Sequence, residues 1–178
     1  QTALAITDHG VMYGVIDFYR ECKKQGIKPI LGMEAYVSHR AYTVKEGKAD
    51  RDYAHLILLA KDQIGYQNLM QLSSEAFIHG FYYKPRIDYK LLRQHSEGLI
   101  CLSACLSGDL PKLLLDDRHD DAVAYIHEMQ DIFGKDNFFV EIMDHGIREE
   151  KLVLPRLIAG DLVKKEDLDR LGEGGLCL

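Results

Sequence analysis

Short apolar runs alternate along this chain with segments in which apolar residues recur at helical spacing. The runs predict buried strands, at residues 3–7, 30–37, 55–60, 98–104 and 138–143. The helically spaced segments predict helices, at residues 13–25, 62–77, 89–95, 110–115, 122–133 and 149–158. Such alternation predicts an α/β fold whose strands pair in parallel through right-handed crossovers.

The breaks between these elements carry turn and capping residues. Gly26 ends the first predicted helix, and Pro29 opens the next strand. Asp62 is an expected N-cap, because its side chain can accept a hydrogen bond from the first turn of the helix that follows it. The charged residues of 39–52 predict an exposed loop, and the acidic stretch 116–121 predicts a solvated junction between two helices.

Composition is typical of a soluble globular domain. The 178 residues, 47% hydrophobic and 28% charged, suffice for one domain with a sizeable core. The apolar runs are too short to cross a membrane, no signal peptide is evident, and the four cysteines match no disulfide framework. We therefore expect a cytoplasmic protein. The net charge of −6 argues against a free-standing nucleic-acid-binding module, but a metal-dependent phosphoesterase stays open, because bound cations reverse the local field.

Candidate chemistry begins at the end of the first predicted strand. Asp8 and His9 follow it directly, and Gly10 then turns the chain. In parallel α/β folds, ligands and catalytic groups gather at the carboxyl ends of the strands. The pair suits a histidine metal ligand with a carboxylate that orients it. The alternative interpretation is a capping aspartate beside a packed histidine.

Glu34 and His55 belong to later strands. Glu34 lies inside an apolar run, where a buried carboxylate needs a partner such as a metal ion, although in an alternating strand it would face solvent. His55 opens its strand, and in a parallel barrel that end lies away from the strand-end residues. Spacing alone thus leaves His55 open between a metal ligand and a structural hydrogen-bonding residue.

Cys105 follows the strand predicted at 98–104. As a thiolate ligand it would favour a zinc-like metal, and otherwise it is a small apolar side chain. Cys101 lies four residues earlier, on the same face of an alternating strand. A Cys-x3-Cys pair without a second pair is a weak zinc signal.

Asp144 and His145 end the strand predicted at 138–143, much as Asp8 and His9 end the first. We expect them to support a ligand or to cap a loop rather than to bind a metal directly. The chain carries no glycine-rich phosphate loop, no nucleophile elbow and no H-E-x-x-H motif. Dinucleotide-binding, serine-hydrolase and zincin functions therefore lack support.

Several segments resemble successive motifs of the PHP (polymerase and histidinol phosphatase) domain, at residues 5–10, 32–37 and 55–60. Others resemble that domain as it occurs at the N-terminus of bacterial DNA polymerase III alpha subunits, at residues 65–69, 80–88, 102–108 and 138–141, followed by His145-Gly146. The Tyr-Tyr-Lys-Pro-Arg stretch within 80–88 is the most discriminating, because it is not expected in stand-alone PHP phosphatases.

The resemblance implies a distorted (β/α)7 barrel that holds a cluster of divalent metal ions, zinc or manganese, with magnesium an alternative. By position it implies four metal ligands: His9, Glu34, His55 and Cys105. It makes Asp8 a partner of these ligands, a supporting role that Asp144 and His145 would share. Arg86 would contact a phosphate or form a structural ion pair.

The function implied is that of the PHP segment of a bacterial replicative DNA polymerase, with phosphoesterase or 3′–5′ exonuclease activity or a role in supporting the polymerase. The implied partners are DNA, the remaining polymerase domains and other replisome subunits, without a membrane. Two alternatives stay open. One is a stand-alone phosphatase of small phosphate esters, similar to histidinol phosphatase, and the other is a structural module that binds no metal.

The resemblance also implies that the barrel is incomplete at both ends. The first family motif, His-x-His, would precede residue 1, and the closing Asp-x-His motif would follow the helix near Pro155. We therefore assign residues 1–158 to the PHP domain and leave 159–178 as a tail that does not match the family. Because these ligands are missing, we expect the segment alone to be inactive or nearly so.

Overall fold

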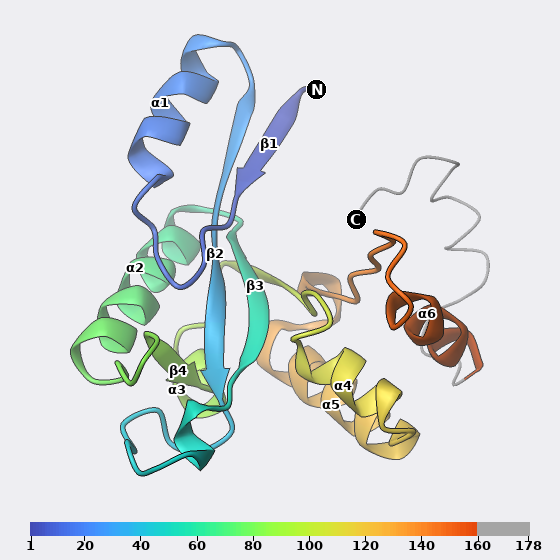
Figure 1. Ribbon diagram of the computed structural model, residues 1–178. Helices are drawn as coiled ribbons and strands as arrows, with labels where there is room; N and C mark the ends of the chain where they lie inside the picture. The colour runs from blue at the N-terminus through green and yellow to red at the C-terminus, as the bar shows by residue number, and fades with distance from the viewer. Residues whose placement is uncertain (160–178) are drawn as a thin grey trace. The chain divides into compact units, whose positions relative to one another are not determined.

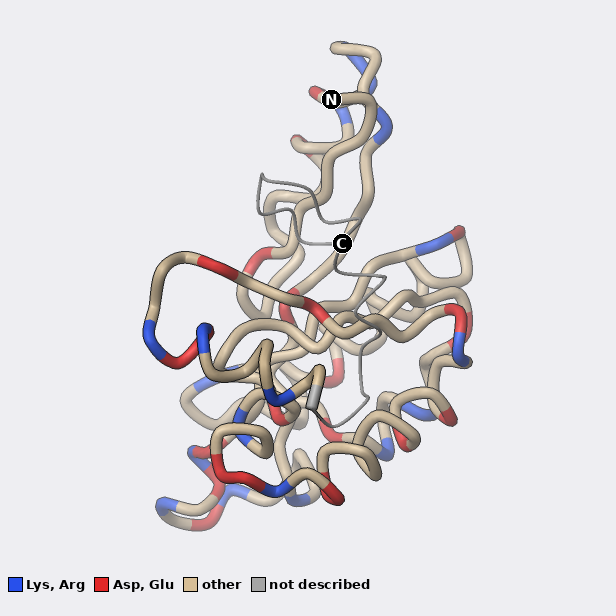
Figure 2. The backbone as a smooth tube through the Cα atoms, turned by 90° about the vertical axis from the view of Figure 1, so that its right-hand side faces the viewer, with Lys and Arg blue, Asp and Glu red and all other residues tan. Residues whose placement is uncertain are grey.

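The computed structural model describes residues 1–159 and divides into two compact units, Gln1–Cys101 and a second that begins at Leu102 (Figure 1). All but the first residue of the tail predicted at 159–178 lies outside the described residues. Lys and Arg positions are interspersed with Asp and Glu positions along the backbone (Figure 2). In the part of the chain that the structure describes, no helix has the length and apolar character needed to span a membrane.

The first unit is built on a sheet in the order β1-β2-β3-β5, with β4 beside β2. The strands are β1 (Ala3–Ile6), β2 (Lys28–Ser38), β3 (Ala54–Ala60), β4 (Arg86–Asp88) and β5 (Leu99–Leu102). β1 and β4 run parallel to β2, whereas β3 runs antiparallel to it. The prediction of uniformly parallel pairing is therefore wrong at β3. The connection before β3 contains only the short 3-10 turn η1 (Ala49–Arg51) instead of a crossover helix, so the chain returns beside the end of β2.

Three helices belong to this unit: α1 (Val15–Lys24), α2 (Gln63–Ile78) and α3 (Tyr89–Gln94). α1 and α2 lie on the same side of the strands β1, β2 and β3 (Figure 1). Asp62 caps α2 as predicted, because its carboxylate accepts a hydrogen bond of 2.9 Å from the Gly65 N–H. Leu69, Leu72 and Ala76, which fall at helical spacing along α2, are all buried.

Two strands differ from the sequence prediction. β1 was expected to be buried, but Leu4 is 43% exposed, because only β2 pairs with β1 among the described residues. β4 was not predicted at all. It has three residues, all buried, and so short a run gives no periodic signal.

The second unit contains α4 (Asp109–Leu115), α5 (His119–Phe133), η2 (Lys135–Asn137), β6 (Phe138–Phe139) and α6 (Glu150–Ala159). β6 is shorter than the strand predicted at 138–143. α5 begins earlier than predicted, so Asp120 and Asp121 of the acidic stretch lie in its first turn, where they complement the helix dipole. Buried residues of these helices form the core of this unit: Leu110, Leu114, Met129 and Leu157.

The fold is mixed α/β, as the alternation of elements predicted. The strands of the described residues form an open sheet with β1 at one edge. They do not close into the expected barrel.

Candidate metal centre

Two backbone hydrogen bonds hold the turn after β1 against β2. The Glu34 N–H donates to the Asp8 carbonyl at 3.0 Å, and the Gly10 N–H donates to the Glu34 carbonyl at 2.8 Å. They form an isolated parallel bridge between His9 and Glu34, beyond the last residue of β1. The backbone thus fixes His9 beside Glu34.

Gly10 is required by the geometry of this turn. Its φ is +69°, in the left-handed region that glycine adopts without a steric penalty. A Cβ at this position would lie 2.6 Å from Cε2 of Tyr36 and 3.0 Å from Cγ of Pro85. The turn therefore packs directly on the Tyr36 ring, with no room for a side chain.

The antiparallel direction of β3 brings His55 to the same place. Tyr36 pairs with His55, and Glu34 pairs with Ile57. Side chains two residues apart share a face of a strand, so Glu34, Tyr36 and His55 lie on one face of the β2–β3 pair. The start of β3 thus lies beside the carboxyl end of β2, which resolves the difficulty that a parallel arrangement posed for His55.

The three side chains meet in one cluster. His55 Nδ1 lies 2.5 Å from Glu34 Oε1, and His9 Nε2 lies 3.4 Å from Glu34 Oε2. One ligand atom from each residue lies within 4.8 Å of the others. The side chains of Glu34 and His55 are 13% and 17% exposed, whereas that of His9 is 65% exposed, so the cluster opens to solvent on the His9 side.

This donor set fits a divalent transition metal. Two imidazoles and a carboxylate suit zinc or manganese better than calcium, which prefers oxygen ligands. In a tetrahedral site with bonds of about 2.0–2.1 Å, ligand atoms lie roughly 3.3 Å apart. The separation of 3.4 Å between His9 and Glu34 is close to that value. A small rearrangement of the short His55–Glu34 contact would complete the site.

The Asp8 carboxylate contacts the backbone that follows the turn. Its carboxylate accepts a hydrogen bond of 3.3 Å from the Gly14 N–H, just before α1. A Cβ on Gly14 would lie 2.9 Å from the Asp8 Oδ2 atom, so the two residues are closely packed. The role of Asp8 as a partner of the metal ligands stays a prediction.

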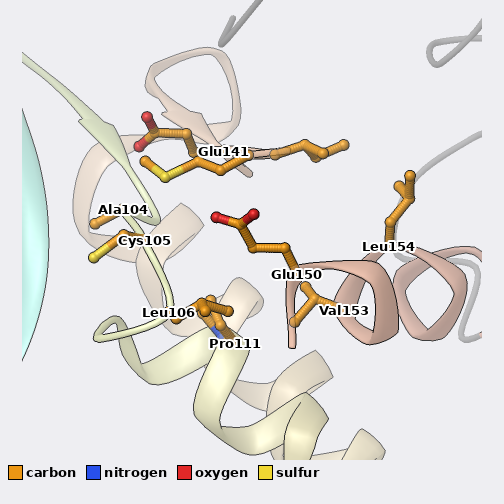
Figure 3. A pocket seen from close by; sticks show the side chains of 10 residues that line it. Ala104, Cys105, Leu106, Pro111, Glu141, Glu150, Val153 and Leu154 are labelled. Carbon is orange, nitrogen blue, oxygen red and sulfur yellow. The ribbon is translucent and has the colours of Figure 1, made fainter. Parts of the chain in front are cut away.

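Cys105 belongs to the second unit and lines a small cavity of about 20 Å³ together with Glu141 and Glu150 (Figure 3). Such a volume holds about one water molecule and no organic substrate. Ala104, directly before it, has a φ of +62°, a conformation that is rare for residues with a side chain. Whether Cys105 binds a metal stays a prediction. Cys101 is fully buried, and burial raises the pKa of its thiol well above the usual range, which keeps it neutral in the core.

Asp144 and His145 cap the approach to α6. Asp144 accepts a hydrogen bond of 3.0 Å from the Gly146 N–H. His145 Nδ1 lies 2.8 Å from Glu150 Oε1, and the His145 backbone N–H donates to Glu150 Oε2 at 2.7 Å. The carboxylate of Glu150 raises the pKa of His145, and the same hydrogen bonds lower the pKa of Glu150. These contacts match the loop-capping interpretation.

Arg86 is fully buried, and its guanidinium donates to backbone carbonyls of the loop before β3 and of Gly80. The acceptors in that loop are the carbonyls of Tyr42, Val44 and Asp50. Burial lowers the pKa of Arg86, and the nearby Asp50 carboxylate opposes this effect. The guanidinium is thus occupied with holding the loop, which leaves the phosphate contact considered for Arg86 without structural support.

Sequence reasoning did not single out the side chains around His55. The rings of Tyr36 and Tyr53 lie 5.2 Å and 6.0 Å from the His55 ring, and the Lys84 Nζ atom lies 5.5 Å from the centre of the Tyr36 ring. Burial raises the pKa of the Tyr36 hydroxyl, and the Lys84 ammonium opposes this effect. Alternation could have flagged Tyr36, two residues after Glu34, but nothing local marks Lys84.

Comparison with known proteins supports the resemblance. A model of the PHP domain family matches residues 1–145. A protein named DNA polymerase III subunit alpha from Treponema pallidum is 52% identical over 159 residues, which cover 89% of this chain and 14% of that protein. Proteins of the same name from Thermus aquaticus and Borreliella burgdorferi are 51% and 46% identical, over 85% and 87% of this chain.

The chain spans only 12% to 14% of the length of these curated relatives. The family match, by contrast, includes His9, Glu34, His55 and Cys105 and extends over most of the described residues. The chain belongs to the PHP domain family.

Proposed function

We propose that this chain is the PHP segment of a bacterial DNA polymerase III alpha subunit and that His9, Glu34 and His55 hold a divalent metal centre for hydrolysis of phosphoesters at DNA 3′ ends. The observation that carries the proposal is the convergence of these three side chains from β2, β3 and the turn after β1. The match to the PHP family and the identity of 45% to 52% with proteins named DNA polymerase III subunit alpha support it.

The bound metal would supply a hydroxide from water at neutral pH and neutralise phosphate charge. Each of the three residues has a different position around the metal. Glu34 offers one carboxylate oxygen toward each imidazole, and His55 is held between the strands with its ring beside Tyr36 and Tyr53. His9 lies on the solvent side, so a substrate approaches from that side.

The remaining parts of the proposal extend beyond the described residues. In the intact protein, the open sheet is completed to the distorted (β/α)7 barrel implied by the family. The intact protein works in the cytoplasm, with DNA, the other polymerase domains and replisome subunits as partners. A stand-alone phosphatase fits less well, because the relatives reported above carry the name DNA polymerase III subunit alpha.

Metal analysis and nuclease assays on the intact protein test the proposal together. We expect bound zinc or manganese by elemental analysis and release of nucleotides from the 3′ end of single-stranded DNA. Glu34→Gln and His55→Ala should each lower metal content and reduce the rate by about 100-fold or more, because a lost ligand costs at least as much as the roughly 10–100-fold lost with a residue that supports one.

His79→Ala is the matched control, because His79 is an exposed histidine at the end of α2 that pairs only weakly with Glu75, at 3.9 Å. It should retain full metal content and rate. An intact protein that binds no metal would overturn the proposal and favour a structural module. Metal-dependent hydrolysis of small phosphomonoesters without action on DNA would favour the phosphatase instead.

A further inference from the structure

Lys84 is an exposed cation beside Tyr36, whose ring contacts His55 of the candidate metal centre. Its carbonyl accepts a hydrogen bond of 3.0 Å from the Tyr82 N–H across a tight turn in which Tyr83 has a φ of +62°. Pro85, which follows, lies close to the His9–Gly10 turn. A Cβ added to Gly10 would lie 3.0 Å from the Pro85 Cγ atom. The Lys84 ammonium lies 5.5 Å from the centre of the Tyr36 ring.

Tyr36 joins this cation to the metal ligands. Its ring packs edge-on against the His55 ring at 5.2 Å, and it shares a strand face with Glu34. Lys84 is exposed, and no carboxylate forms an ion pair with it among the residues that the structure describes. Its charge is thus accessible to an anion from solvent.

Arg86 cannot fill that role. It lies two residues further along, and its guanidinium is buried among backbone carbonyls. Lys84 lies before the buried strand β4, where the chain is still at the surface. The Tyr-Tyr-Lys-Pro-Arg stretch therefore places one basic residue inside the fold and one at the edge of the site.

We propose that Lys84 binds a phosphate oxygen of the substrate at the His9–Glu34–His55 centre. The inference rests on the proposed function and names a substrate-contact residue for it. An ammonium is a compact point charge with three donors, which suits a phosphate oxygen beside a metal. The cation–π contact with Tyr36 limits the rotamers of Lys84, so the side chain loses less conformational entropy when the phosphate binds.

The test measures binding of inorganic phosphate to the intact protein by titration calorimetry, with and without manganese, next to the kinetics of DNA hydrolysis. Lys84→Met should weaken phosphate binding about tenfold, the lower range for a lost charge-assisted hydrogen bond. It should raise KM by a similar factor and leave manganese affinity unchanged. Lys84→Arg should restore phosphate binding to within about threefold of the wild type.

Lys90→Met is the control, because Lys90 is an exposed lysine on α3, and it should change neither binding nor KM. Phosphate binding by Lys84→Met at the wild-type affinity would overturn the proposal, as would a Lys84→Arg variant as weak as Lys84→Met. If the wild type binds manganese but no phosphate, the Lys84 contact fails and the metal centre stands. If it binds phosphate through Lys84 but no manganese, the metal centre fails and the anion contact stands.

Discussion

Two basic residues of one short segment have opposite environments at the residue scale. The Arg86 side chain is fully buried and donates to four carbonyls, three of them in the loop before β3. Lys84 remains exposed over the Tyr36 ring. A planar guanidinium can serve several acceptors at once, whereas an ammonium on a flexible stem stays hydrated. The residue types therefore fit their environments.

The buried position of Arg86 predicts a local loss of stability on substitution. In Arg86→Met, the carbonyls of Tyr42, Val44 and Asp50 lose a charged donor. The free energy of local opening of residues 39–52, measured by hydrogen exchange, should fall by about 3 kcal/mol. Arg93→Met on α3 should change it by less than about 0.5 kcal/mol, as for most surface substitutions. Equal exchange in wild type and Arg86→Met would contradict this account.

At the element scale, strand direction and helix caps position the site. The antiparallel β2–β3 pair brings His55 beside Tyr36, at the end of β2 where Glu34 also lies. Two residues, Lys61 and the N-cap Asp62, separate the end of β3 from the start of α2. The cap matters because Gly65, its donor, is packed so closely on the Gly98 carbonyl that an added Cβ would lie 1.8 Å from that oxygen.

Loss of this cap should weaken the start of α2. Asp62→Ala leaves the Gly65 N–H without its side-chain acceptor, and we expect a loss of about 1 kcal/mol in the stability of the first turn. Hydrogen exchange of residues 63–67 provides the measurement. Asp62→Asn should retain most of the stability, because its amide oxygen can still accept the bond. A similar loss in both variants would point to a role for the charge instead.

The pair of His145 and Glu150 predicts a pH window for the start of α6. Glu150 raises the pKa of His145, so protonated His145 stabilises the start of α6. This stabilisation is complete below the ordinary histidine pKa of about 6.5 and is lost as pH rises through the raised pKa. His145 lowers the pKa of Glu150, so ionised Glu150 also stabilises this segment. That stabilisation is present above the ordinary glutamate pKa of about 4.3 and is lost as pH falls through the lowered pKa.

Exchange of residues 145–153, corrected for the intrinsic effect of pH, should therefore be slowest in a window from weakly acidic to near-neutral pH. Glu150→Gln should abolish the loss of exchange protection at high pH, since His145 then lacks its charged partner. An identical pH profile for wild type and variant would show that the pair does not stabilise this segment.

At the scale of the whole molecule, the proposed metal centre couples binding to folding. A ligand that binds only the native state stabilises it, by about 2.7 kcal/mol at 100 times its dissociation constant. Chelation should therefore lower the melting temperature of the first transition of the intact protein, and added manganese should restore it. Glu34→Gln should remove this response, whereas Glu21→Gln, an exposed position on α1, should retain it. A chelator without effect on the wild type would contradict the coupling.

Much of this arrangement could be predicted because its causes are local. The helix cap at Asp62 and the buried face of α2 follow from residues within a few positions of one another. The motif segments around His9, Glu34 and His55 indicate the PHP family from the sequence alone. What could not be predicted depends on partners far away in the chain, such as the carbonyls around Arg86 and the Tyr36 ring under Lys84.

The sequence by itself determined the order and type of the elements and the family of the chain, because periodicity and motifs are properties of neighbouring residues. Only the tertiary structure decided that His55 joins His9 and Glu34, and that Lys84 is exposed beside the Tyr36 ring whereas Arg86 is buried. The apolar pattern of a strand is the same whichever way its neighbour runs. The short connection lets β3 return antiparallel to β2, and the register that places His55 beside Tyr36 exists only once the two strands pair.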